Sequence, residues 1–205
     1  MVTVNQDRVI GIFAQARYGK SSMLADVLAK IPMRVFLYDT NFEYGEPNPE
    51  KPHIQRIRSL PNVLIFEPDR RRAKSLEYLK LVFKDLRAKT TNIFVWVEDL
   101  EKFFFNKSSR DFDTDELNEM VSSGGGHQRI PFGYLCKQLK YIPLPVISNT
   151  NLFYFGQFTE KDDLDRIGGI VSAERIKGLK KMPLPPEFLR YDRWTGEQKI
   201  VRANL

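Results

Sequence analysis

Runs of consecutive apolar and β-branched residues, each as long as a strand, recur along the chain. They are RVIGIFA (8–14), RVFLYD (34–39), NVLIFE (62–67), NIFVWVED (92–99), FGYLCKQ (132–138) and LFYFGQF (152–158). Uninterrupted apolar runs of this length are typical of strands that are buried on both faces of a sheet. The pattern therefore predicts a central sheet built from these segments.

Helical periodicity separates several of the predicted strands. Apolar residues recur every third or fourth position in KSSMLADVLAKI (20–31) and in SLEYLKLVFKDLRAK (75–89), and this spacing places them on one face of a helix. Strands that alternate with such helices indicate an α/β fold with a mainly parallel sheet flanked by helices. Toward the end, the pattern changes to a basic helix (172–181) and a hairpin (188–203), which predict a small C-terminal β extension.

The length of the chain allows one domain with a sizeable core. The 205 residues are 42% hydrophobic and 28% charged, which is ordinary for a globular protein. We expect a single domain over 1–205, with a core at about 8–170 and an extension of helix and strands at about 171–205. Cys136 lies in an apolar run and is expected to be a buried structural thiol. No apolar run approaches the roughly 18 residues that a membrane-spanning helix needs.

The segment IGIFAQARYGKSS (10–22) links the first predicted strand to the first predicted helix. Its Gly-Lys-Ser ending follows the P-loop pattern G-x-x-x-x-G-K-[ST], although Ala14 stands at the position of the first glycine. Alanine is tolerated there if its φ angle is negative. Backbone N–H groups at the start of a helix bind phosphate oxygens, so we expect Lys20 to reach the β- and γ-phosphates and Ser21 to bind Mg²⁺. The predicted nucleotide-binding residues are Ala14, Gln15, Ala16, Arg17, Tyr18, Gly19, Lys20, Ser21 and Ser22. A strand–turn–helix junction with a chance lysine is the alternative.

Polar side chains end two of the other apolar runs. Glu98 and Asp99 end the run at 92–99, and Gln138 ends the run at 132–138. In phosphoryl-transfer sites one carboxylate at a strand end contributes to the Mg²⁺ shell, while a neighbouring carboxylate polarises the attacking water. A glutamine on the adjacent strand can bind the γ-phosphate or that water. An exposed acidic pair and a solvated strand end are the alternatives that residue type leaves open.

Taken in order, these motifs resemble the FtsK–HerA superfamily of P-loop DNA-pumping ATPases. FLYDTNFEY (36–44) resembles its hydrophobic strand followed by Asp and Glu-Tyr. RIPFGYLCKQLKYIP (129–143) resembles its arginine, hydrophobic strand, sensor glutamine and proline. The resemblance covers roughly residues 9–158. It implies a RecA-like core, hydrolysis of ATP with Mg²⁺, assembly into a hexameric or pentameric homo-oligomeric ring, and movement of double-stranded DNA.

The resemblance also implies a role for each matched residue. Glu98 takes the strand-end position that binds Mg²⁺ together with Ser21, directly or through water, and Asp99 is its catalytic partner. The superfamily usually places Asp before Glu, so the roles of these two acids are exchangeable. Gln138 is the sensor, and Arg129 is offered in trans to the nucleotide of the neighbouring subunit, with capping of a loop as its alternative. Further candidates are Asp39, Glu43 and Arg110, the last as a second trans arginine.

Within the superfamily, the small size and the C-terminal extension resemble the genome-packaging NTPases of Sulfolobus turreted icosahedral viruses. That branch implies packaging of viral DNA into a preformed capsid and docking on capsid or internal-membrane vertex proteins. It also implies work in the host-cell cytoplasm during virion assembly, with retention in the virion left open. The alternatives are a small P-loop kinase, a cellular HerA-like DNA-pumping ATPase, and a nucleotide-gated assembly factor without turnover.

The net charge of +6 mildly favours an acidic partner, such as nucleic acid or an anionic membrane surface. Three basic clusters could contact DNA phosphates. They are Arg70-Arg71-Arg72 with Lys74, the Lys102–Lys107 region, and the group of Arg175, Lys177, Lys180 and Lys181. A solvated charged face is the usual alternative for such a run.

Overall fold

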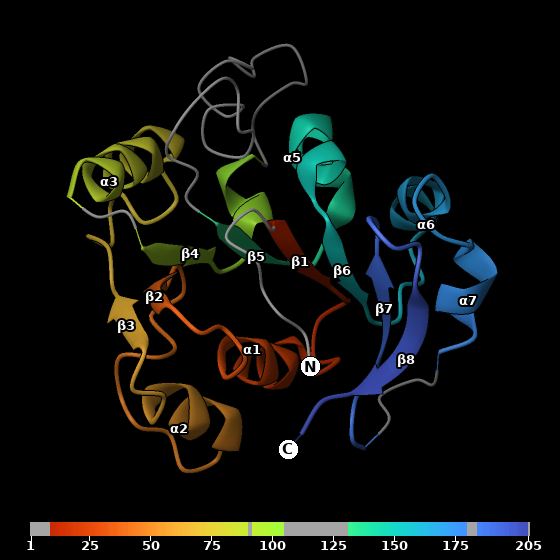
Figure 1. Ribbon diagram of the computed structural model, residues 1–205, viewed down its shortest axis with the longest axis horizontal. Helices are drawn as coiled ribbons and strands as arrows, with labels where there is room; N and C mark the ends of the chain where they lie inside the picture. Colours follow the sequence, from red (N-terminus) through yellow and green to blue (C-terminus); the bar gives the residue numbers. More distant parts are fainter. Residues whose placement is uncertain (1–8, 90–91, 105–130, 180–183, 205) are drawn as a thin grey trace.

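One sheet runs through the molecule and carries helices on both of its faces (Figure 1). The computed structural model describes residues 9–89, 92–104, 131–179 and 184–204. In these residues the strands are β1 (Val9–Phe13), β2 (Arg34–Tyr38), β3 (Val63–Phe66), β4 (Ile93–Val97), β5 (Phe132–Cys136), β6 (Leu152–Phe155), β7 (Glu187–Asp192) and β8 (Gln198–Arg202). Their order in the sheet is β3-β2-β4-β5-β1-β6-β7-β8.

The first six strands are parallel, and the last two continue the sheet as an antiparallel hairpin. β1 lies between β5 and β6, with Phe13 opposite Cys136 on one side and Phe155 on the other. β4 lies between β2 and β5. Because parallel strands end at the same edge of a sheet, the polar residues that follow β1, β2, β4 and β5 come together there.

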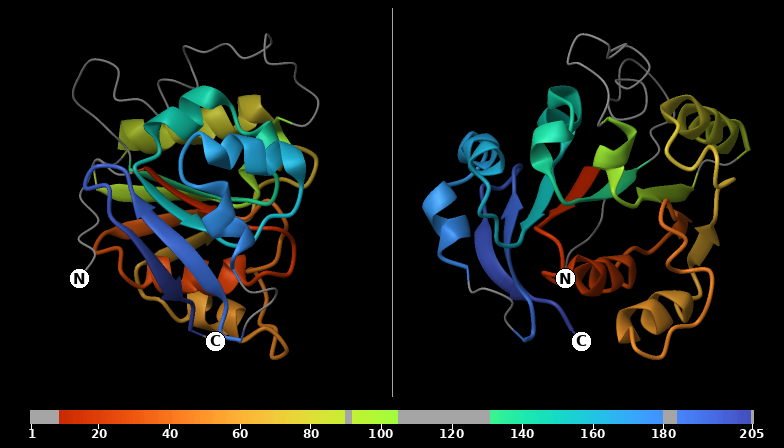
Figure 2. Two further views of the ribbon diagram at one scale, coloured as in Figure 1. Left: turned by 90° about the vertical axis from the view of Figure 1, so that its right-hand side faces the viewer. Right: turned by 180° about the vertical axis from the view of Figure 1, so that it is seen from behind.

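Helices cover the two faces of this sheet. They are α1 (Lys20–Leu28), α2 (Pro52–Arg58), α3 (Leu76–Lys89), α5 (Leu144–Asn149), α6 (Lys161–Gly168) and α7 (Ala173–Lys177), with short 3₁₀ turns at η1 (Leu100–Phe103) and η2 (Leu139–Tyr141). α1 and α2 pack on the face that contains Ile10 and Ile12, whereas α3 and α5 lie on the opposite face (Figure 2). Both faces are apolar, which explains why the strands read as continuous apolar runs.

The predicted fold class is confirmed. The six predicted parallel strands are present with ends within three residues of the predicted ones, and the predicted C-terminal hairpin is formed by β7 and β8. The predicted helix at 172–181 is shorter, because α7 ends at Lys177 and Gly178 follows it. α2, α5 and α6 had no counterpart among the predicted helices. Cys136 is buried, as predicted.

Over the residues that the structure describes, no helix is long and apolar enough to cross a membrane.

Candidate nucleotide-binding site

The P-loop segment connects β1 to α1 through a tight turn with two left-handed residues. Arg17 has a φ of 64° and Gly19 a φ of 91°. Gly19 is the N-cap of α1, so the unpaired N–H groups of the first helical turn face the loop. A Cβ atom on Gly19 would lie 2.3 Å from Cγ of Pro186, in the segment before β7. Glycine is therefore required here both by its backbone angle and by the C-terminal segment.

Ala14, in place of the first glycine of the pattern, is accommodated by a glycine elsewhere. Its φ angle is not positive, and the residue is fully buried at the end of β1. A Cβ atom on Gly156, just after β6, would lie 2.6 Å from Cβ of Ala14. The space that the alanine methyl group needs is thus provided by the adjacent strand, so the departure leaves the loop intact.

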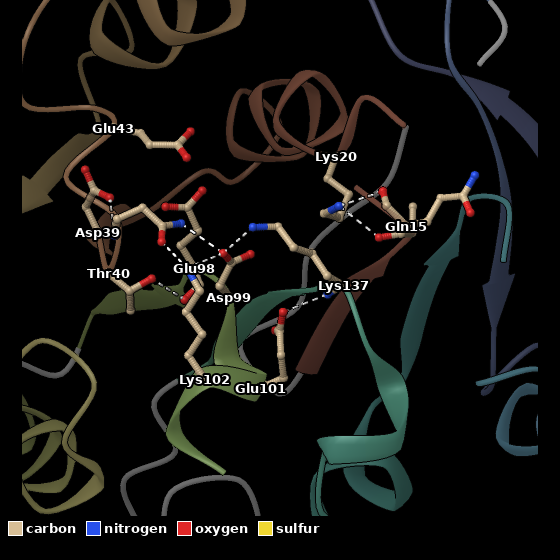
Figure 3. A network of polar contacts seen from close by, with 12 residues as sticks. Gln15, Lys20, Asp39, Thr40, Glu43, Glu98, Asp99, Glu101, Lys102 and Lys137 are labelled. Carbon is tan, nitrogen blue, oxygen red and sulfur yellow. Dashed lines mark hydrogen bonds and ion pairs between the residues drawn. The ribbon is translucent and has the colours of Figure 1, made fainter. Parts of the chain in front are cut away.

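Lys20 folds back over its own loop. Its Nζ donates hydrogen bonds to the carbonyl oxygens of Ala14 (2.8 Å) and Gln15 (2.9 Å), and the residue is buried (Figure 3). Burial, followed by the charge of nearby Lys137, lowers the pKa of Lys20 to about 8. An anion bound in the loop would stabilise the charged form of Lys20 and raise its pKa.

Glu98 is buried behind the loop with half of its carboxylate unsatisfied. Oε1 accepts a hydrogen bond of 2.9 Å from the hydroxyl of Tyr44, whereas Oε2 has no hydrogen-bond partner in the part of the chain that the structure describes. Ser21, in the P-loop helix, opposes the burial-driven rise in the pKa of Tyr44, so the start of this helix lies near Tyr44 and this acid. Burial, the charge of Asp99 and that of Asp39 raise the pKa of Glu98 well above its usual value.

Asp99 has the opposite environment. Its Oδ2 accepts hydrogen bonds from Asn41 Nδ2 (3.0 Å) and Lys137 Nζ (2.6 Å) and forms an ion pair with Lys102 Nζ (2.8 Å), and its φ angle is 45°. Burial raises the pKa of Asp99, but the hydrogen bonds from the two lysines and the amide outweigh it and leave the pKa below its usual value. Two adjacent acids are thus driven toward different protonation states, an arrangement that gives each a separate chemical role.

The other predicted site residues take different places. Asp39 accepts hydrogen bonds from the backbone N–H groups of Asn41 (3.1 Å) and Tyr44 (2.8 Å), so it shapes the turn that presents Tyr44. Glu43 is half-buried and lies 3.9 Å from Lys51. Gln138 is half-buried and follows β5 at the same edge of the sheet.

Within the P-loop, the side chains divide into buried and exposed sets. Ala16 and Arg17 are exposed at the tip of the loop, and Ser22 is buried in α1. Tyr18 is buried, with its ring 5.5 Å from that of Phe188 in β7, so it anchors the loop to the C-terminal hairpin. Arg129 and Arg110, predicted as trans arginines, lie outside the described residues.

Sequence reasoning missed two residues that the structure places in the site. Lys137 pairs with Asp99, and its backbone N–H donates to Oε1 of Glu101 (3.1 Å). Glu101 is buried with no partner for its Oε2, and burial raises its pKa to about 7. Both residues stand within two positions of a predicted one, but their side-chain contacts join different strands and cannot be read from spacing. Lys102, which belongs to a cluster predicted to contact DNA, forms an ion pair with Asp99.

Comparisons with known proteins were made against sequences and structures. No protein-family model matches the chain, and no curated protein sequence matches it. Among solved structures, the genome packaging NTPase B204 from Sulfolobus turreted icosahedral virus 2, in complex with ATP-gammaS, is similar with a TM-score of 0.72 and 19% identity. That similarity covers 98% of this chain and 100% of B204.

Two further structures extend the comparison. B204, the DNA-packaging ATPase from Sulfolobus turreted icosahedral virus, has a TM-score of 0.71 and 16% identity, covering 98% of this chain and 100% of that one. ATPases 2 and 3 of EssC from Geobacillus thermodenitrificans have a TM-score of 0.58 and 16% identity, covering 97% of this chain and 39% of that one. At these identities the likeness establishes the fold, and this fold is the one that the predicted resemblance to the FtsK–HerA superfamily implies.

Proposed function

We propose that the chain is an ATP-hydrolysing DNA translocase that packages double-stranded viral DNA into a preformed capsid. One observation carries the proposal. Lys20, Ser21 and the buried Glu98 meet at one edge of a RecA-like sheet, and this sheet, C-terminal hairpin included, corresponds over 98% of the chain to a genome packaging NTPase. The site residues and the whole fold thus point to the same function, which is stronger support than a short motif alone.

The residues around Glu98 fit a Mg²⁺ ion that accompanies ATP. The Ser21 hydroxyl and the Glu98 carboxylate offer oxygen ligands, and Oε2 of Glu98 has no hydrogen-bond partner among the described residues. Mg²⁺ that accompanies ATP takes few protein ligands beside the phosphates. When bound, Mg²⁺ would neutralise charge on the β- and γ-phosphates.

The chain's own groups supply the remaining chemistry. Lys20 exchanges its two loop carbonyls for phosphate oxygens, while the first N–H groups of α1 face the same anion. Asp99, held as a carboxylate by its donors, polarises the attacking water. Gln138, on the neighbouring strand, detects the γ-phosphate. In this scheme Glu98 binds the metal ion and Asp99 polarises the attacking water.

The translocase assignment further requires DNA contact and a ring. Arg70, Arg71, Arg72 and Lys74 are exposed between β3 and α3, so they could contact DNA phosphates irrespective of sequence. We propose a homo-oligomeric ring in which Arg129 reaches the neighbouring subunit's nucleotide. We further propose docking on capsid or internal-membrane vertex proteins in the host-cell cytoplasm.

A second candidate is a FtsK-type ATPase of another pathway, such as a cellular DNA-pumping enzyme. It is favoured by the similarity to EssC, but the TM-score for EssC is 0.58, against 0.72 for B204. The closer structural likeness therefore supports the packaging assignment over the alternative. Among the described residues, no contact in the site favours a small P-loop kinase.

Phosphate release tests the proposal. Wild-type protein should release phosphate from ATP with Mg²⁺, and duplex DNA should increase the rate, while nucleosides and nucleoside monophosphates should accept no phosphoryl group. Lys20→Met, which keeps the aliphatic stem of the side chain and removes the charge, should lose turnover with an unchanged circular dichroism spectrum. Phosphorylation of an acceptor, or unchanged turnover in Lys20→Met at saturating ATP, would overturn the assignment.

A further inference from the structure

Three polar groups crowd Oδ2 of Asp99. Asn41 Nδ2 and Lys137 Nζ donate hydrogen bonds to this oxygen at 3.0 and 2.6 Å, and Lys102 Nζ forms an ion pair with it at 2.8 Å. A carboxylate oxygen offers about two lone-pair sites. One of the three donors is therefore surplus, and its departure would leave Asp99 ionised and fully paired.

Of the two lysines that contact Asp99, Lys137 is the more exposed and gives up fewer contacts when it leaves. Its side chain is 38% exposed, whereas that of Lys102 is 19% exposed. Lys102 also donates a hydrogen bond to Oδ1 of Asn41, so it contacts both Asn41 and Asp99. Asp99 is the one side-chain acceptor recorded for the Lys137 ammonium among the described residues.

Lys137 already lies beside the phosphate-binding loop. Figure 3 shows its side chain running between Lys20 and Asp99, and its charge is the second-largest cause of the lowered pKa of Lys20. The main chain at Lys137 is fixed by Glu101, whose Oε1 accepts its N–H at 3.1 Å. An ammonium on a four-carbon stem can thus change partner while its backbone stays in place.

We propose that Lys137 is a γ-phosphate-binding residue that is held on Asp99 until a nucleoside triphosphate arrives. Its ammonium then moves to the terminal phosphate, and Asp99 keeps Lys102 and Asn41 while its carboxylate becomes available to the attacking water. Lys137 thereby distinguishes a triphosphate from a diphosphate. The inference rests on the proposed nucleotide-hydrolysing function and adds a cation supplied by the same subunit.

Equilibrium binding of ATPγS and of ADP, measured with Mg²⁺ by calorimetry, tests this assignment. Lys137→Met should weaken ATPγS binding by about 10- to 100-fold, the effect of losing one charge-assisted hydrogen bond, while ADP binding changes by less than about twofold. Lys137→Arg should retain most of the preference for ATPγS. Lys102→Met, the matched control that removes the other lysine from Asp99, should change both affinities by the same factor.

The outcomes separate the two proposals. Equal losses of ATPγS and ADP binding in Lys137→Met, or no loss, in protein whose thermal midpoint matches the wild type would refute the role of Lys137 and leave the ATPase assignment standing. A wild-type protein that binds neither nucleotide would refute the proposed function and the role of Lys137 together. Lys137→Gln, of similar length and neutral, serves as a second variant if Lys137→Met is not folded.

Discussion

The surroundings of Glu98 disfavour the ionised form of its carboxylate. The residue is 3% exposed, one carboxylate oxygen has no partner, and burial raises its pKa well above the usual value. An ionised carboxylate in this position lowers the stability of the fold unless a cation compensates it. The residue is therefore better explained by function than by stability.

Replacement of Glu98 by glutamine should stabilise the protein while removing its activity. Above pH of about 4.5 the unfolded side chain is ionised, whereas the folded one keeps its proton up to its raised pKa. In this pH range the folded wild-type protein binds more protons than the unfolded one, so its stability falls as the pH rises. The amide of Glu98→Gln does not titrate, so the variant does not lose this stability. The thermal midpoint of Glu98→Gln should exceed that of the wild type by a few degrees at pH 8 and by less at pH 5, since about 1 kcal/mol shifts the midpoint by roughly 2–4 °C at this size.

The measurement is thermal unfolding at both pH values in the presence of a chelator. Glu50→Gln is the control, because Glu50 is exposed on the surface. Its midpoint should follow the wild type at both pH values. A Glu98→Gln midpoint that differs from the wild type by the same amount at pH 5 and pH 8 would contradict the account.

At the residue scale, the sequence revealed the groups that belong to local motifs. Lys20 and Ser21 end a short pattern with fixed spacing, and Glu98 and Asp99 end an apolar run. Lys137 escaped notice because its importance comes from an ion pair with Asp99, 38 positions away, across two strands. Such contacts depend on strand order, which no local pattern encodes.

At the element scale, the P-loop is supported by segments that follow it by more than 100 residues. Pro186 lies against Gly19, and the ring of Phe188 packs on Tyr18. Gly156 leaves room for the methyl group of Ala14. The turn that would bind phosphate is therefore shaped by β6 and by the entry to β7 as well as by its own sequence.

Gly19→Ala should destabilise the protein more than Gly196→Ala does. Both glycines have positive φ angles, 91° and 71°, so both substitutions cost the strain of a left-handed alanine. A Cβ atom at position 19 also meets Pro186 at 2.3 Å, whereas none of the atoms around Gly196 comes within 4 Å. The difference in unfolding free energy between the two variants should be about 1 kcal/mol or more, measured by urea denaturation.

A double variant tests the cause of that difference. Pro186→Gly removes the atoms that the new methyl group would meet, so adding it to Gly19→Ala should recover the excess loss and leave the backbone strain. Additive effects of the two substitutions would show that Pro186 does not support the loop.

Strands with uninterrupted apolar runs were predictable, and short helices with few apolar positions were harder to predict. β4 and β5 are fully buried, so their sequences carry uninterrupted apolar runs. α6 spans eight residues and is anchored mainly by Leu164 and Ile167, which is too few apolar positions to reveal a helical period. Its place in the fold follows from tertiary packing on η2 rather than from its sequence pattern.

At the scale of the whole molecule, the end of the described chain is tied to the helix that follows the P-loop. Asn204 donates two hydrogen bonds of 2.8 Å to Asp26 in α1, and Arg56 of α2 pairs with the same carboxylate at 2.5 Å. The C-terminal hairpin and the nucleotide site thus belong to one continuous structure. A change in either could be transmitted to the other, as a motor that couples hydrolysis to movement requires.

Displacement of a third strand from duplex DNA tests the central claim, that ATP hydrolysis moves this protein along DNA. A labelled oligonucleotide forms a triplex at one end of a linear duplex, and its release is followed with time. The account predicts that wild-type protein releases it with ATP and Mg²⁺ on duplexes of unrelated sequence, and that neither ATPγS nor Lys20→Met supports release. An intact triplex in a reaction where the same protein hydrolyses ATP on the same DNA would contradict the claim.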